Sequence, residues 1–167
     1  IDVNNIDKTF AQTKLTYSVA KGEFTNGNVE VILECDEDIL TPEGWLKNTQ
    51  SDGKVNYVKT FTENGSYDFE LQDLAGNKKT ITVVIDQIDR IAPVINGIEN
   101  NKYYKNDVTY TIDEEHLDYV TINGLKYTEN ILTTFSDEGN YVVTVVDKAG
   151  NQTTVNFVID KTIPIVV

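Results

Sequence analysis

Apolar and polar residues alternate in short runs along most of the chain, and no helical periodicity is longer than one turn. Side chains of a β-strand point alternately to its two faces, so each run predicts a strand with one buried face. The expected strands are 14–19, 28–35, 55–61, 67–72, 80–85, 108–112, 117–122, 125–127, 141–146 and 153–159. Short strands at this spacing predict an all-β fold of the sandwich type.

One turn sequence occurs twice, as Asp73-Leu74-Ala75-Gly76-Asn77 and as Asp147-Lys148-Ala149-Gly150-Asn151. Residues 61–86 align with residues 135–160 without a gap, and 11 of these 26 positions are identical. A repeat of this length indicates a repeated structural unit. The sequence therefore predicts two tandem domains, residues 1–89 and residues 90–167.

The residue types of this turn suit a tight reversal of the chain. Glycine adopts positive φ without strain, asparagine tolerates the left-handed conformation, and aspartate accepts hydrogen bonds from nearby backbone amides. We expect structural roles for Asp73, Gly76, Asn77, Asp147, Gly150 and Asn151. Asn123-Gly124 gives a second turn signal, that of a type I′ hairpin.

A tyrosine stands at the start of the second-to-last strand of each domain, in Asn64-Gly65-Ser66-Tyr67 and in Glu138-Gly139-Asn140-Tyr141. Immunoglobulin-type sandwiches often carry a tyrosine there, with its hydroxyl bonded back across the corner. We therefore expect structural roles for Tyr67 and Tyr141, and two tandem immunoglobulin-like β-sandwich domains.

These residues carry a family resemblance. The repeat resembles the bacterial immunoglobulin-like repeats of secreted and cell-wall-anchored proteins of Gram-positive bacteria. The resemblance rests on the order of its motifs: a tyrosine, Asp-x-Ala-Gly-Asn, an alternating strand, Ile-Asp and then Lys-Thr-x-Pro. The second domain resembles the commoner form, and the first resembles a variant with Gly44-Trp45 midway. The first domain departs from the pattern where Phe10-Ala11-Gln12 replaces the expected proline. The resemblance implies a cell-surface or secreted setting, a role as spacer, stalk or accessory module in a large protein, and no catalytic residues.

Three segments read as junctions between repeats: 6–9, 88–93 and 159–164. A proline after the last strand ends sheet pairing and stiffens the connection. Because two of these segments lie at the ends of the chain, we expect the parent protein to continue with neighbouring repeats.

The charge of the chain limits the classes of partner that it can bind. The formal net charge is −13, and lysine and arginine form no cluster. Nucleic acid and anionic membranes are repelled by such a chain, and no apolar run of about 18 residues is present for membrane insertion. Lysine, asparagine and acidic residues on the strands discourage edge pairing, so we expect a monomer.

Catalytic chemistry finds no support in the pattern. A nucleophile with its base, paired carboxylates in a cleft or a metal cluster is required, and none is evident. Cys35 is the single cysteine and lies on the apolar face of an expected strand, and His116 is the single histidine. We expect a non-catalytic region without a cofactor.

Calcium is the main chemical alternative, since it binds several hard oxygen ligands. The sequence offers Asp86 with Asp89 near the junction, or Asp7 with Asp36, Glu37 and Asp38 if those loops converge.

Exposed aromatic residues are the other candidates for binding, with a glycan or a host surface protein as ligand. Trp45, Tyr103 and Tyr104 are the candidates, although Trp45 also suits the core. Because strand neighbours point to opposite faces, one of the two tyrosines should face solvent. The predicted function is a spacer or adhesion stalk of a surface protein. The alternative is an accessory binding module attached to a secreted enzyme.

Overall fold

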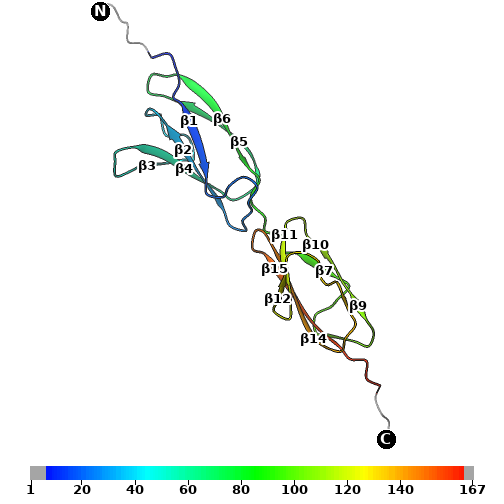
Figure 1. The fold of residues 1–167 in the computed structure, drawn as a ribbon. Coiled ribbons are helices and arrows are strands. Elements are labelled where there is room, and N and C mark those ends of the chain that lie inside the picture. Colours follow the sequence, from blue (N-terminus) through cyan, green and yellow to red (C-terminus); the bar gives the residue numbers. More distant parts are fainter. Residues whose placement is uncertain (1–6, 164–167) are drawn as a thin grey trace, which may run out of the picture. The chain divides into compact units, whose positions relative to one another are not determined.

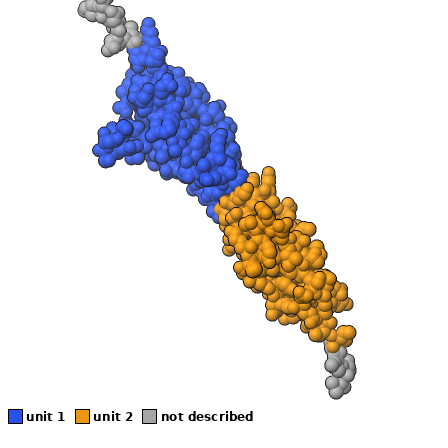
Figure 2. Space-filling model, viewed as in Figure 1, with its two compact units in different colours: residues 1–89 blue, residues 90–167 orange. Residues whose placement is uncertain are grey.

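The computed structural model describes residues 7–163, which form fifteen strands and no helix (Figure 1). The all-β prediction is confirmed. The chain divides into two compact units, residues 1–89 and residues 90–167, coloured separately in Figure 2. Two ends of the predicted junction segments, Ile6 and Pro164, lie outside the described residues. Within the described range no helix is long and apolar enough to cross a membrane.

Unit 1 consists of two antiparallel sheets around one core. Its strands are β1 (Thr13–Tyr17), β2 (Val29–Cys35), β3 (Leu46–Thr49), β4 (Val55–Phe61), β5 (Gly65–Gln72) and β6 (Lys78–Ile85). One sheet has the order β1-β2-β4-β3, and β5 pairs with β6 in the other. The alternate residues of β2 and β6 that are buried pack against each other between the sheets: Val29, Val31, Leu33, Ile81, Val83 and Ile85.

Unit 2 encloses a second core with shorter strands. These are β7 (Val94–Asn96), β8 (Lys102–Tyr104), β9 (Val108–Thr109), β10 (Thr111–Asp113), β11 (Leu117–Ile122), β12 (Leu125–Tyr127), β13 (Thr134–Phe135), β14 (Gly139–Asp147) and β15 (Gln152–Ile159). A five-stranded sheet has the order β12-β11-β14-β15-β8. The pairs β7–β10 and β9–β13 lie on the other side of the core, which includes Val108, Tyr110, Phe135, Val143 and Phe157.

Most predicted strands are present, with shifted ends. The strand expected at 14–19 ends at Tyr17, and the strand expected at 108–112 is interrupted at Tyr110. The Asn123-Gly124 turn joins β11 to β12 with positive φ at both residues, as a type I′ hairpin requires. Alternation does not indicate β3, whose four residues are all exposed, nor β7, β8 and β13, which are two or three residues long.

The repeated turn has the same hydrogen bonds in both units. In unit 1, Asp73 accepts a bond from the backbone N–H of Asn77 at Oδ1 and one from the Asn77 side-chain amide at Oδ2, both 2.8 Å. Asp147 and Asn151 repeat both bonds at 2.8 Å. Gly76 and Gly150 have φ of 95° and 88°. The turn closes β5–β6 and β14–β15 in one geometry.

The repeated tyrosines also have matching contacts. The Tyr67 hydroxyl donates to the carbonyl of Glu63, and the Tyr141 hydroxyl donates to the carbonyl of Asp137, each at 3.0 Å. In both units the ring packs on a core phenylalanine, Phe61 or Phe135. The tyrosine thus fixes the bend that leads into the second-to-last strand.

Candidate functional site

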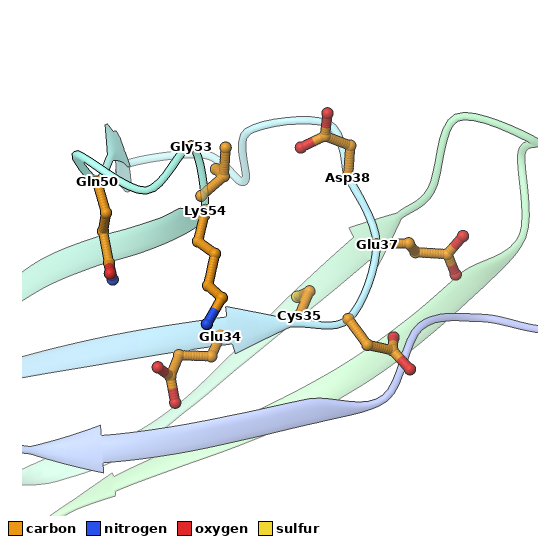
Figure 3. Close-up of a pocket in the computed structure, with 9 residues that line it drawn as sticks. Glu34, Cys35, Glu37, Asp38, Gln50, Gly53 and Lys54 are labelled. Carbon is orange, nitrogen blue, oxygen red and sulfur yellow. The ribbon is translucent and has the colours of Figure 1, made fainter.

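The loop after β2 gathers acidic residues at one end of unit 1. A polar hollow of about 440 Å³ lies beside it, lined by residues that include Glu34, Cys35 and Lys54 (Figure 3). In Figure 3 the Glu37 side chain points away from Gln50 and Lys54. Glu37 also lines a second hollow of about 400 Å³, which includes Asp7.

Three carboxylates converge on that second side: those of Asp7, Glu37 and Asp73. One oxygen of each lies within 4.8 Å of the others. The segment before β1 contributes Asp7, the loop after β2 contributes Glu37, and the β5–β6 turn contributes Asp73. Asp7 and Glu37 are exposed, whereas Asp73 is only 2% exposed. We call these three residues the acidic cluster.

The charges of the acidic cluster act on one another. Partial desolvation, followed by the negative charges of Asp7 and Asp73, raises the pKa of Glu37 above its ordinary value. Desolvation also acts to raise the pKa of Asp73, but hydrogen bonds from Asn77 and neighbouring backbone amides outweigh it and lower that pKa. Asp73 therefore keeps its charge, and the repulsion within the acidic cluster appears as the raised pKa of Glu37.

The acidic cluster offers a hard cation three oxygens, while calcium takes six to eight, so backbone carbonyls or water must supply the rest. Of the residues predicted as ligands near Asp7, only Glu37 meets it. Asp36 accepts a hydrogen bond from the Gln12 backbone, and Asp38 lies 3.7 Å from Lys47 Nζ. Asp73, expected to have only a turn role, completes the group.

The other predicted calcium ligands have different surroundings. Asp86 is exposed just after β6, and its backbone N–H donates to the side chain of Gln87. Among the described residues, Asp86 belongs to no group of three metal-ligating side chains. The backbone N–H of Asp89 donates to the carbonyl of Thr25 at 2.9 Å. The pairing of Asp86 with Asp89 therefore stays a prediction.

Cys35 ends β2 and has a free, half-buried thiol. Burial, with a further contribution from the negative charge of Asp36, raises the pKa of this thiol to about 11. A thiol with so high a pKa holds almost no thiolate at neutral pH and is a poor nucleophile.

Trp45 lies in the core of unit 1. Its side chain is 4% exposed and meets Phe69 edge-on, with the ring centroids 5.3 Å apart. Its indole N–H has no hydrogen-bond partner among the described residues. A ring in this position offers no face to a surface ligand, because only 4% of the residue is exposed.

The two adjacent tyrosines of β8 point to opposite faces. Tyr104 packs edge-on against Phe157, and its hydroxyl accepts a hydrogen bond from the Glu99 backbone at 2.9 Å. Tyr103 faces solvent with 73% of its surface exposed. Beside it lies a shallow groove of about 210 Å³, formed over β8, β15 and β14. The structure therefore separates a core tyrosine from a surface tyrosine.

Two side chains that the sequence analysis did not single out hold the chain where it leaves each unit. Both amide atoms of Asn64 bond the backbone of Ile88, at 2.8 and 3.0 Å. In unit 2 the carboxylate of Glu138 accepts a hydrogen bond from the backbone N–H of Lys161 at 2.6 Å. Asn64 and Glu138 occupy the same position of the repeat, immediately before Gly-x-Tyr. Their shared position in the repeat is the sequence signal from which this role could have been predicted.

No protein-family model matches the chain. It is similar to an outer cell wall protein of Brevibacillus brevis, with 27% identity over 180 aligned positions that cover 96% of this chain. The chain spans 17% of the length of that relative. A solved structure, the Bacteroides ovatus mixed-linkage glucan utilization locus SGBP-B in complex with mixed-linkage heptasaccharide, aligns with 81% of this chain and 42% of its own, at 16% identity and a TM-score of 0.25. A TM-score this low supports no conclusion about fold or function.

Proposed function

We propose that this chain is a non-catalytic spacer of a bacterial cell-surface protein, built from two immunoglobulin-like β-sandwich modules. The similarity to an outer cell wall protein along 96% of the chain supports a surface location. Within that setting, the role we infer is to hold other parts of a protein apart and to resist pulling.

The strand order supports immunoglobulin-like modules. An immunoglobulin-like sandwich packs a four-stranded antiparallel sheet on a second sheet that contains the last hairpin. In unit 1 the sheet β1-β2-β4-β3 packs on the hairpin β5–β6 through one core. In unit 2 the last hairpin, β14–β15, is flanked by β11 on one side and β8 on the other. The tyrosine at each corner fits the same architecture.

The observation that carries the spacer function is a parallel pairing at the end of each unit: an early segment pairs with the last strand in unit 2, and with the residues just after the last strand in unit 1. In unit 2, β8 runs parallel to β15, with Lys102 opposite Phe157 and Tyr104 opposite Ile159. In unit 1, Thr25 donates to the carbonyl of Gln87 and accepts from the N–H of Asp89, both at 2.9 Å.

Parallel pairing determines how a pulling force acts on these bonds. The two strands of a parallel pair point the same way, so force applied to the start of one and the end of the other slides them past each other. Sliding strains all hydrogen bonds of the pair at once, whereas peeling an antiparallel hairpin breaks them singly. Parallel pairing therefore makes a module that carries load along its chain more resistant to unfolding.

Single-molecule force spectroscopy of the whole chain tests the spacer function. Replacing Thr25 by proline removes the N–H that bonds Gln87, so we expect Thr25→Pro to lower the force of one unfolding event and to leave the other unchanged. Thr25→Ala is the matched control, because it keeps both backbone bonds and loses only the hydroxyl bond to Gly27. Equal unfolding forces for the wild type and Thr25→Pro contradict a load-bearing role.

The alternative function, an accessory binding module, is favoured by one observation. The groove beside the exposed ring of Tyr103 gives unit 2 a place where a ligand can lie across the five-stranded sheet.

A further inference from the structure

The outer face of the five-stranded sheet in unit 2 is uncharged around Tyr103. On this face Val158 of β15 lies opposite both Tyr103 of β8 and Asn140 of β14, and Asn156 of β15 lies opposite Val142 of β14. Of these, Val142 and Asn156 are exposed, and Val158 is partly buried. The groove over this face is lined by Asn101, Tyr103, Asn140, Val142, Asn156 and Val158, together with the strand positions Tyr141 and Phe157. None of these residues carries a charge at neutral pH.

The polar groups of the groove are available to a ligand. Among the described residues, the side-chain amides of Asn101, Asn140 and Asn156 donate and accept no hydrogen bond within the protein. Each amide provides two N–H donors and one acceptor oxygen. Three amides around an exposed ring therefore form a surface with an apolar centre and hydrogen-bonding edges.

The backbone under the groove is held in place. Asn123, from the β11–β12 turn, accepts a hydrogen bond from the N–H of Val142 at 2.8 Å and donates one to the carbonyl of Asn140 at 3.1 Å. On the other side, the backbone N–H of Asn156 donates to the side chain of Asn100 at 2.9 Å. A surface fixed before binding loses little conformational entropy when a ligand arrives.

This combination selects for a particular ligand chemistry. A pyranose ring presents C–H groups on its flat face and hydroxyl groups around its edge, which match an aromatic face and amide side chains. An anionic ligand finds no positive partner in the groove and is repelled by a chain of net charge −13. The open, shallow form of the groove suits one side of an extended chain better than a small molecule enclosed on all sides.

We propose that the groove beside Tyr103 in unit 2 binds a neutral glycan chain, with Tyr103 stacking on one sugar ring and Asn140 and Asn156 bonding its hydroxyls. The inference rests on the alternative binding function and gives it a site and a ligand class. The spacer function stands without it, since the force experiment on Thr25 does not involve this groove.

The first test is a titration of the isotope-labelled whole chain with cellohexaose and chitohexaose, followed by amide chemical shifts in NMR. Shifts concentrated at residues of β8, β14 and β15 around the groove are the expected result. Hyaluronate and polygalacturonate serve as anionic comparators and are expected to cause none. Absence of shifts with both neutral glycans, shifts located elsewhere, or preferred binding of the anionic polymers overturns the proposal.

Variants then test the role of single side chains. Tyr103→Ala is expected to weaken glycan binding by about tenfold or more, and Tyr103→Phe, which keeps the ring, is expected to bind nearly as well. Leu46→Ala is the matched control, because Leu46 is equally exposed, at 75%, but belongs to unit 1. Asn156→Ala is expected to weaken binding severalfold. Unchanged affinity in Tyr103→Ala overturns the stacking role, and the wild-type titration remains decisive if a variant does not fold.

Discussion

Single residues hold the repeated turn together through a buried charge. Asp73 is almost fully buried, yet both of its carboxylate oxygens are bonded by Asn77, and Asp147 is bonded by Asn151 in the same way. A buried carboxylate is stable only when its oxygens are satisfied. The aspartate and the asparagine of this turn therefore act as one unit, and neither is replaceable alone.

Removing this carboxylate is expected to destabilise unit 1. Asp73→Ala removes the acceptor of the Asn77 backbone N–H and the shorter of two bonds made by the Asn77 side-chain amide, and we expect the free energy of unfolding to fall by about 1–3 kcal/mol. Trp45 is the only tryptophan, so its fluorescence in a urea titration reports on unit 1. Leu74→Ala, in the same turn and 70% exposed, is the control expected to change little. A stability loss as small as that of the control contradicts this role.

Two tyrosines of unit 2, the buried Tyr110 and the partly exposed Tyr141, are expected to respond oppositely to loss of the hydroxyl. The Tyr110 hydroxyl is buried without a hydrogen-bond partner among the described residues, and burial raises its pKa to about 12. Tyr110→Phe should therefore be neutral or stabilising, whereas Tyr141→Phe loses a bond and should cost about 0.5–1.5 kcal/mol. Native-state hydrogen exchange of the β14 core amides measures both, and equal destabilisation by the two substitutions contradicts this expectation.

Repulsion at Glu37 gives a prediction that depends on pH. Because the folded state raises the pKa of Glu37, ionisation of this residue opposes folding, and the penalty is present at neutral pH. Glu37→Gln should raise the urea midpoint of the Trp45 transition at pH 7. The gain should disappear as pH falls through the raised pKa and below the ordinary one, where Glu37 is protonated in both states. Glu43→Gln, another exposed glutamate of unit 1, is the control, and an equal gain from it contradicts the role of the acidic cluster.

At the scale of elements, close approach between strands restricts one glycine far more than another. Gly97, after β7, has φ of 93°, and an added Cβ meets the carbonyl oxygen of Thr109 at 2.5 Å. Gly124, in the β11–β12 turn, has φ of 83° and open space around it. A side chain at either position would be strained by the positive φ, but only at Gly97 would its Cβ also clash with backbone.

The two alanine substitutions should therefore separate strain from clash. Gly124→Ala is expected to lower the stability of unit 2 by about 1 kcal/mol, through backbone strain alone. Gly97→Ala is expected to lower it by about 3 kcal/mol or to unfold unit 2, since the backbone of β9 must move. Hydrogen exchange of the β14 amides measures the difference. Equal losses show that the approach of Gly97 to Thr109 is not restrictive.

At the scale of the whole molecule, the net charge of −13 opposes compactness. Sodium chloride raised from about 10 mM to about 150 mM should therefore raise the thermal midpoint, because screening weakens repulsion between exposed charges. Calcium chloride at equal ionic strength tests the acidic cluster, because calcium bound to the folded state would raise the midpoint of the Trp45 transition further. Glu37→Gln should lose that additional rise. Equal effects of the two salts on the wild type contradict calcium binding at the acidic cluster.

The sequence by itself determined the features that depend on residues close together in the chain. Alternation indicated β11 and β12 with their observed bounds, because Val120 and Ile122 of β11 face the core and the Asn123-Gly124 turn fixes where the two strands meet. Asn123-Gly124 and Asp-x-Ala-Gly-Asn specified their turns, because glycine and asparagine are the residues that accept positive φ. Local backbone preference and a period of two are properties that a sequence displays directly.

Only the tertiary structure decided which distant residues meet. Asp7, Glu37 and Asp73 converge from three separate segments, and their spacing in the sequence does not predict that they meet. Strand β3 has no buried face to give an alternating pattern, and β8 is too short to show one, so its parallel pairing with β15 comes from long-range hydrogen bonds. Burial of Trp45 and exposure of Tyr103 were settled in the same way, because the packing of two sheets determines which aromatic rings the core encloses.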